Sequence, residues 1–115
     1  MTDAPLRLGI DLGTSAVKTV VIDESGSVVA SGEAAFPTIA EAPGQAEQET
    51  RDWLEAAGAA VAAIGRQLGG DWQHRIAGIG LAGQLPTLVC LGDWQIRCER
   101  TMNLRRAISL RLTPN

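Results

Sequence analysis

The residues best able to do chemistry lie close together in the segment LGIDLGTSAVK, at positions 8–18. It holds one carboxylate, Asp11, a turn of Gly13, Thr14 and Ser15, and one ammonium group, Lys18. Glycine allows positive φ and close backbone approach, so amide N–H groups and the two hydroxyls can converge on an anion such as a nucleotide phosphate. A carboxylate beside phosphate oxygens commonly holds Mg²⁺ through water. A hairpin whose Asp and Thr only satisfy turn amides fits the same residues.

Alternating apolar residues predict that this turn joins two strands. The first strand ends near Asp11 and has one apolar face, made by Leu6, Leu8, Ile10 and Leu12. The returning strand is marked by Val17, Val20, Val21 and Ile22. A tight turn at 23–26 then leads to a third strand at 27–32.

The middle of the chain predicts a surface loop, a helix and further strands. Apolar residues recur with no sustained period in residues 36–48, which predicts a surface loop. Thr50 can cap a helix that stops at Gly69-Gly70. Its apolar face consists of Trp53, Leu54, Ala57, Val61, Ile64 and Leu68, and we expect it to cover the sheet. Residues 75–81 predict a buried strand, and residues 85–91 one more strand.

Three segments in order resemble the FGGY carbohydrate kinases, most closely the xylulokinases, within the actin, Hsp70 and sugar-kinase ATPase superfamily. They are LGIDLGTSAVK with VVIDESGSVVASG, then PGQAEQETRDWLEAAGAAV, then IAGIGLAGQ. The resemblance implies an α/β fold of the ribonuclease H-like type, of which residues 1–95 form the N-terminal portion with an incomplete sheet. A family member is about four times longer by resemblance, and its active site lies between two domains.

The resemblance also implies cofactors and roles. The implied cofactors are ATP and Mg²⁺. By resemblance, Asp11 organises the metal, and the turn residues Gly13, Thr14 and Ser15 contact phosphate. Lys18 matches a basic position of the same hairpin. In the family, an aspartate later in the chain is the general base on the sugar hydroxyl. No residue here matches that base, so we expect that these 115 residues do not catalyse alone.

On the sugar side, Gln84 matches the glutamine that opens the family's G-Q-M-H-G segment. Leu85 and Pro86 stand where methionine and histidine line the sugar site. This departure removes a polar contact and leaves the sugar undecided. Glu47 and Gln48 match an E-Q pair of a family loop, although solvated loop residues fit equally well.

The spacing of Gly78, Gly80 and Gly83 also spells G-x-G-x-x-G. A dinucleotide site needs a helix opening at the third glycine, whereas the residues that follow, 87–91, are apolar and typical of a strand. We therefore reject that interpretation and expect the glycines to let a strand pack closely against a helix or a sugar.

Charge changes abruptly near the C-terminus. Residues up to Gln95 include five basic and twelve acidic side chains, whereas residues 96–115 hold five arginines and one acid. We favour a shifted reading frame in a GC-rich gene as the origin of this divergent tail. A genuine basic helix is the alternative, because Met102, Leu104, Ile108 and Leu112 give a passable amphipathic pattern.

Composition excludes several classes of protein. A net charge of −3 argues against nucleic-acid binding, and no apolar run is long enough to span a membrane. The first residues lack the features of a signal peptide, so we expect a cytoplasmic protein. Two alternatives remain: a non-catalytic binding or regulatory module that uses the hairpin and the basic tail, and a non-kinase ATPase of the same superfamily. The sequence does not decide the oligomeric state, although an unfinished sheet edge predicts self-association.

Overall fold

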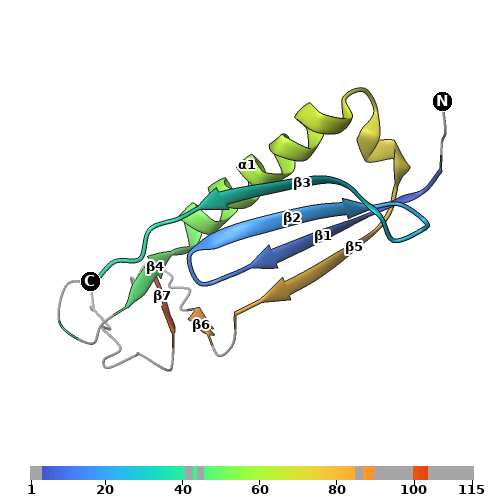
Figure 1. The fold of residues 1–115 in the computed structure, drawn as a ribbon. Helices are drawn as coiled ribbons and strands as arrows, with labels where there is room; N and C mark the ends of the chain where they lie inside the picture. Colours follow the sequence, from blue (N-terminus) through green and yellow to red (C-terminus); the bar gives the residue numbers. More distant parts are fainter. Residues whose placement is uncertain (1–3, 41–42, 44–45, 85–86, 90–99, 104–115) are drawn as a thin grey trace. The chain divides into compact units, whose positions relative to one another are not determined.

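The computed structural model describes residues 4–40, 43, 46–84, 87–89 and 100–103 (Figure 1). The chain divides into two compact units. The first comprises Met1–Phe36 and Trp53–Gly83, and the second comprises Pro37–Asp52 and Gln84–Asn115. Among the described residues, no helix is both long and apolar enough to cross a bilayer.

The first unit is built on a four-stranded mixed sheet. Its strands are β1 (Leu6–Leu12), β2 (Ala16–Ile22), β3 (Val28–Ala35) and β5 (Ile76–Gly83), in the spatial order β3-β2-β1-β5. The first three strands are antiparallel, as expected from their short turns, and β5 runs parallel to β1 after the helical crossover. The predicted strands are confirmed, although β3 extends three residues beyond position 32.

Helix α1 (Thr50–Leu68) lies along one face of this sheet (Figure 1). It begins at Thr50 itself, so the predicted cap is the first helical residue. It stops where predicted, because Gly69 and Gly70 have φ values of 64° and 54°, which favour glycine.

The buried stripe of α1 consists mainly of small side chains, Ala56, Ala60 and Ile64. Leu54, expected in that stripe, is 76% exposed, so its assignment to the apolar face was wrong. The stripe packs on the inward residues of the strands in two clusters: Leu6, Leu8, Val21, Ala30, Ile64 and Trp72, and Val17, Phe36, Ala56 and Ala60. Trp72 belongs to a short 3₁₀ helix, Trp72–Arg75, that leads into β5.

The helix approaches β2 and β3 closely around Thr19 and Gly32. The buried Thr19 hydroxyl donates a hydrogen bond to the Ala60 carbonyl oxygen at 2.9 Å. A Cβ on Gly32 would lie 2.3 Å from the same oxygen and 2.9 Å from Thr19 Oγ1. Only glycine therefore fits at position 32 without a shift of the helix.

Strand β5 is exposed, which corrects the prediction of a buried strand. Ile79 and Leu81 are paired in register with inward residues of β1 but remain 62% and 79% exposed. A Cβ on Gly78 or Gly80 would meet nothing within 4 Å. The close packing of these glycines against a helix is therefore not found among the described residues. Apolar composition alone does not distinguish a covered strand from an uncovered one.

The outer edge of β3 is bound by one helix side chain. Gln67 of α1 accepts a hydrogen bond from the Ser31 amide at 3.0 Å and donates one to the Ser31 carbonyl oxygen. The same Gln67 amide group also donates to the Ala63 carbonyl oxygen at 3.0 Å. A side-chain amide thus occupies the place that a neighbouring strand would take.

The second unit holds a three-stranded antiparallel sheet. Its strands are β4 (Glu47–Glu49), β6 (Thr87–Val89) and β7 (Arg100–Asn103), in the order β4-β7-β6. The loop predicted at 36–48 was therefore wrong at its end, where Glu47 also forms a bridge with Ile39. The strand predicted at 85–91 is confirmed at Thr87–Val89. Arg100–Asn103 is a strand rather than part of a basic helix, and the rest of the tail lies outside the described residues.

Candidate functional site

The β1–β2 hairpin brings the predicted phosphate and metal residues together. Asp11 and Lys18 are directly opposite each other in the antiparallel register, and both are exposed. They lie on the sheet face away from α1, because they alternate with the inward residues Ile10 and Val17. The turn that joins the two strands carries the exposed residues Thr14 and Ser15.

Gly13 serves the turn in a different way from the one predicted. Positive φ occurs at Gly26, Gly69 and Gly70 and not at Gly13. The Gly13 amide instead donates to the Ala16 carbonyl oxygen at 2.9 Å, and a Cβ at Gly13 would lie 3.1 Å from that oxygen. Glycine therefore favours this close approach of the backbone, and the Gly13 amide is already bound within the turn. The phosphate role of the Thr14 and Ser15 hydroxyls stays a prediction.

Glu33 is a third charged residue at this site that the sequence did not reveal. It lies opposite Lys18 in the β2–β3 register and is exposed. A row of Asp11, Lys18 and Glu33 therefore crosses three neighbouring strands on one face. Counting back from the tight turn would pair Lys18 with Gly32, but a bulge between Val21 and Ile22 shifts the register by one residue.

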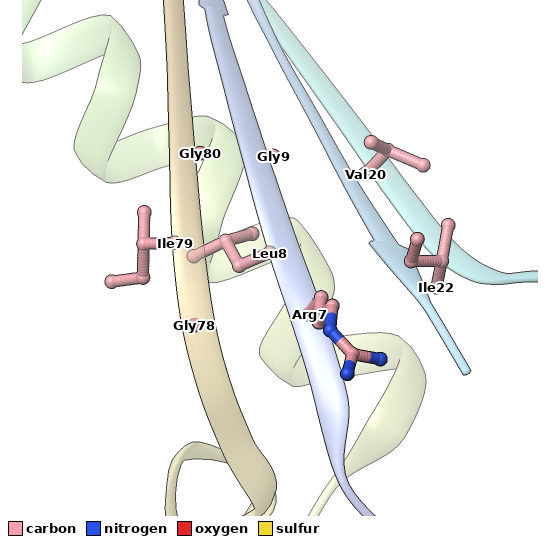
Figure 2. A pocket seen from close by; sticks show the side chains of 8 residues that line it. All are labelled: Arg7, Leu8, Gly9, Val20, Ile22, Gly78, Ile79 and Gly80. Carbon is pink, nitrogen blue, oxygen red and sulfur yellow. The ribbon is translucent and has the colours of Figure 1, made fainter. Parts of the chain in front are cut away.

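Glycines, which have no side chain, leave shallow depressions on the same face of the sheet. A depression of about 330 Å³ is lined by Asp11 and Lys18 together with Gly9, Gly80 and Ala82. A neighbouring depression of about 420 Å³ extends over Gly78 toward Arg7 (Figure 2). Figure 2 shows Gly78 and Gly80 on β5 beside Gly9 on β1, with the Leu8 side chain between these two strands. The charged row therefore borders a shallow apolar floor.

The donor set at this row fits Mg²⁺ held mainly through water. In the described part of the chain, no three His, Cys, Asp or Glu side chains gather as a metal cluster. Mg²⁺ usually keeps several waters and binds one or two carboxylates plus substrate phosphates, so a single exposed carboxylate beside phosphate-binding hydroxyls suits it. Asp11 is the residue that would hold the metal here.

The predicted sugar-side residues are described only in part. Gln84 follows β5 directly and is half-buried, whereas Leu85 and Pro86 lie outside the described residues. Glu47 and Gln48 are in β4, where Gln48 Nε2 donates to Thr38 Oγ1 at 2.9 Å. Gly78, Gly80 and Gly83 all belong to β5, and no helix is found in the described residues after it. The third glycine thus lies in a strand and Thr87–Val89 is a strand as well, as expected, whereas the rejection of a dinucleotide site stays a prediction.

Comparison with known proteins decides the family. The model of the N-terminal domain of the FGGY family of carbohydrate kinases matches residues 6–109. The chain belongs to the FGGY family of carbohydrate kinases. Xylulose kinase of Bacillus subtilis strain 168 is 38% identical to this FGGY chain over 84 residues, which are 73% of the chain and 17% of that enzyme. The chain thus spans about a sixth of the length of the curated relatives it matches.

Two solved kinase structures from Lactobacillus acidophilus match almost equally well. Ligand-bound xylulose kinase has a TM-score of 0.73 at 28% identity, with 85% of this chain and 19% of that chain covered. Gluconate kinase has a TM-score of 0.73 at 27% identity, with 86% and 19% covered. The FGGY chain therefore has the ribonuclease H-like fold of these sugar kinases, as predicted, with a partial mixed sheet.

Proposed function

We propose that this chain is the N-terminal part of an ATP-dependent carbohydrate kinase that transfers a phosphoryl group from ATP to a sugar hydroxyl in the cytoplasm. The observation that carries the proposal is the FGGY match over residues 6–109, which includes the hairpin where Asp11 lies opposite Lys18. Because a phosphoryl-transfer site works mainly by positioning and charge stabilisation, such a hairpin can supply part of it.

Each hairpin residue has a role that follows from its chemistry and place. The Thr14 and Ser15 hydroxyls donate hydrogen bonds to phosphate oxygens, and the Lys18 ammonium attracts their negative charge. The Asp11 carboxylate would hold Mg²⁺ through water, and this ion would neutralise charge on the phosphates. Gly13 closes the turn that carries the two hydroxyls, because its amide donates to the Ala16 carbonyl oxygen.

The proposed sugar is a ketose such as xylulose, and Gln84, Leu85 and Pro86 are the proposed contacts. The curated relatives that the chain matches are xylulose kinases, for example those of Bacillus subtilis and Klebsiella pneumoniae. The solved structures do not decide the point, since a xylulose kinase and a gluconate kinase fit equally well. Leu85 and Pro86 are apolar residue types in the places of the family's methionine and histidine, so the polar contact of that histidine is lost.

A chimeric enzyme tests the proposed function. The segment of Bacillus subtilis xylulose kinase that matches this chain is replaced by residues 6–84, and ATP-dependent phosphorylation of xylulose is measured. We expect activity that Asp11→Ala abolishes and that a matched Asp71→Ala leaves intact, because Asp71 is exposed near the opposite end of the sheet. A folded chimera that is as inactive as its Asp11→Ala variant would contradict the proposal.

We also propose a shifted reading frame as the origin of residues 96–115. The proposal rests on the change from acidic to arginine-rich composition. The family match extends to residue 109, so the alternative is a divergent but genuine family segment. Sequencing the gene from codon 85 decides between them. Kinase-like sequence in another frame supports the shift, and a peptide from 96–115 in the native protein together with no such frame contradicts it.

A further inference from the structure

We propose that Glu33 is a positioning residue that draws the Lys18 ammonium away from Asp11 and so keeps the Asp11 carboxylate available for Mg²⁺. The inference rests on the proposed nucleotide site and assigns that site a residue on a strand outside the hairpin. Its basis is the row of Asp11, Lys18 and Glu33 across β1, β2 and β3.

The geometry places Lys18 midway between the two carboxylates. Residues directly opposite on neighbouring strands have Cβ atoms about 5 Å apart, so the two carboxylates are separated by about 10 Å. The long lysine side chain can reach either one. All three side chains are exposed, and no ion pair joins them in the described structure. The fourth position of the row, on β5, is Ala82, which adds no charge.

The charges of the row decide which ion it attracts. With Asp11 and Lys18 alone, the ammonium would face one carboxylate and would compete with Mg²⁺ for it. Glu33 offers a second, equally close partner and gives the row a net charge of −1. Moving the Lys18 ammonium from beside Asp11 toward Glu33 weakens its repulsion of a cation at Asp11, and a change of this size at a protein surface alters cation affinity about a few-fold.

The β3 bulge is what brings Glu33 to this row. Ile22 pairs with Val28, whereas Val21 pairs with Ala30, so Val29 is the extra residue of β3. A one-residue slip of a strand moves every side chain to the other face. Without the bulge, Gly32 would lie opposite Lys18, and the Glu33 side chain would point to the face that α1 covers.

The experiment is a titration of the ¹⁵N-labelled 115-residue chain at low ionic strength. Mg²⁺ alone, ATP in EDTA, and ATP with Mg²⁺ are added in turn, and the amide signals of Asp11, Thr14 and Ser15 are followed. The test variant is Glu33→Gln. The matched control is Glu24→Gln, which removes the same charge from an exposed residue in the turn at the other end of β2 and β3.

For Glu33→Gln we expect the Mg²⁺ needed for half-saturation to rise about two- to fourfold, and metal-free ATP to bind tighter by a similar factor. Opposite changes for the two ligands distinguish a charge effect from a damaged fold, which would weaken both. Glu33→Asp should restore most of the wild-type behaviour. In a Lys18→Gln background, Glu33→Gln should have a smaller effect, because Glu33 acts through Lys18.

Three results would overturn the inference. If the wild-type signals respond but Glu33→Gln behaves like Glu24→Gln, Glu33 has no positioning role and the proposed function stands. If Glu33→Gln weakens the binding of Mg²⁺ and of metal-free ATP alike, the role of Glu33 is structural. A wild-type hairpin that responds to none of the three additions contradicts the nucleotide site as well, and the chimera then shows whether the kinase assignment survives.

Discussion

Gly32 is the residue at which the helix and the sheet come closest. We expect Gly32→Ala to lower the free energy of unfolding by about 1–3 kcal/mol, because the new methyl group overlaps the Ala60 carbonyl oxygen and forces a shift. Denaturant unfolding followed by circular dichroism measures the change.

Gly58 provides the control for that substitution. It lies on the exposed side of α1, and a Cβ there would meet nothing within 4 Å. Gly58→Ala should therefore raise the free energy of unfolding by up to about 1 kcal/mol through helix propensity alone. Equal effects at Gly32 and Gly58 would contradict the close approach described for the helix.

At the scale of elements, the β2–β3 turn is held by one carboxylate. Asp23 Oδ1 accepts hydrogen bonds from the Ser25 hydroxyl at 2.6 Å and from the Ser27 amide at 3.0 Å. These hydrogen bonds favour the charged carboxylate and hold the pKa of Asp23 below its usual value of 3.8. The bond from the Ser25 hydroxyl has the largest effect.

A lowered pKa predicts a defined dependence of stability on pH. The charge of Asp23 stabilises the folded chain above the unfolded-state pKa, and this contribution is lost as pH falls through the lower folded-state pKa. Asp23→Asn keeps an acceptor for the turn but removes the titration. We expect its unfolding free energy to fall less steeply below pH 4 than that of the wild type, measured against Glu24→Gln as the control for charge loss. Parallel curves would contradict this role.

The four strands and the long helix of the first unit could be predicted from the sequence, whereas their surroundings and the strands β4 and β7 could not. Apolar residues alternate with others around Leu8, and they recur every three to four positions around Ile64. These two local periods indicated the hairpin and the helix. The exposure of Leu81 depends on what covers β5, which no local pattern encodes. The candidate site shows the same division: Asp11 and Lys18 are neighbours across one turn, whereas Glu33 reaches them only through a bulge that the sequence does not reveal.

At the scale of the whole molecule, β5 predicts self-association of this chain. Its eight residues, Ile76–Gly83, include no charged side chain, and Ile79 and Leu81 are exposed. Uncharged, apolar edge strands invite pairing with another strand. Leu81→Lys should therefore reduce concentration-dependent association in sedimentation velocity.

Leu54→Lys is the matched control, since Leu54 is 76% exposed but lies on a helix without a strand edge. It should leave association unchanged. A monomeric wild-type chain, or an equal response to both lysine substitutions, would show that β5 is not the associating element.

The Gln67 side chain of α1 blocks one edge of this sheet, at β3, so that a further strand can be added more easily at the other edge. By binding both the amide and the carbonyl of Ser31, it imitates the next strand and ends the ladder on that side. The opposite border is β5, which carries no charged side chain and exposes Ile79 and Leu81. Any added strand, whether from a designed fusion, a split-protein complement or a misfolded neighbour, therefore has one side on which to nucleate. A binder engineered for this chain should be an extended peptide matched to β5, because on β3 it would first have to displace Gln67.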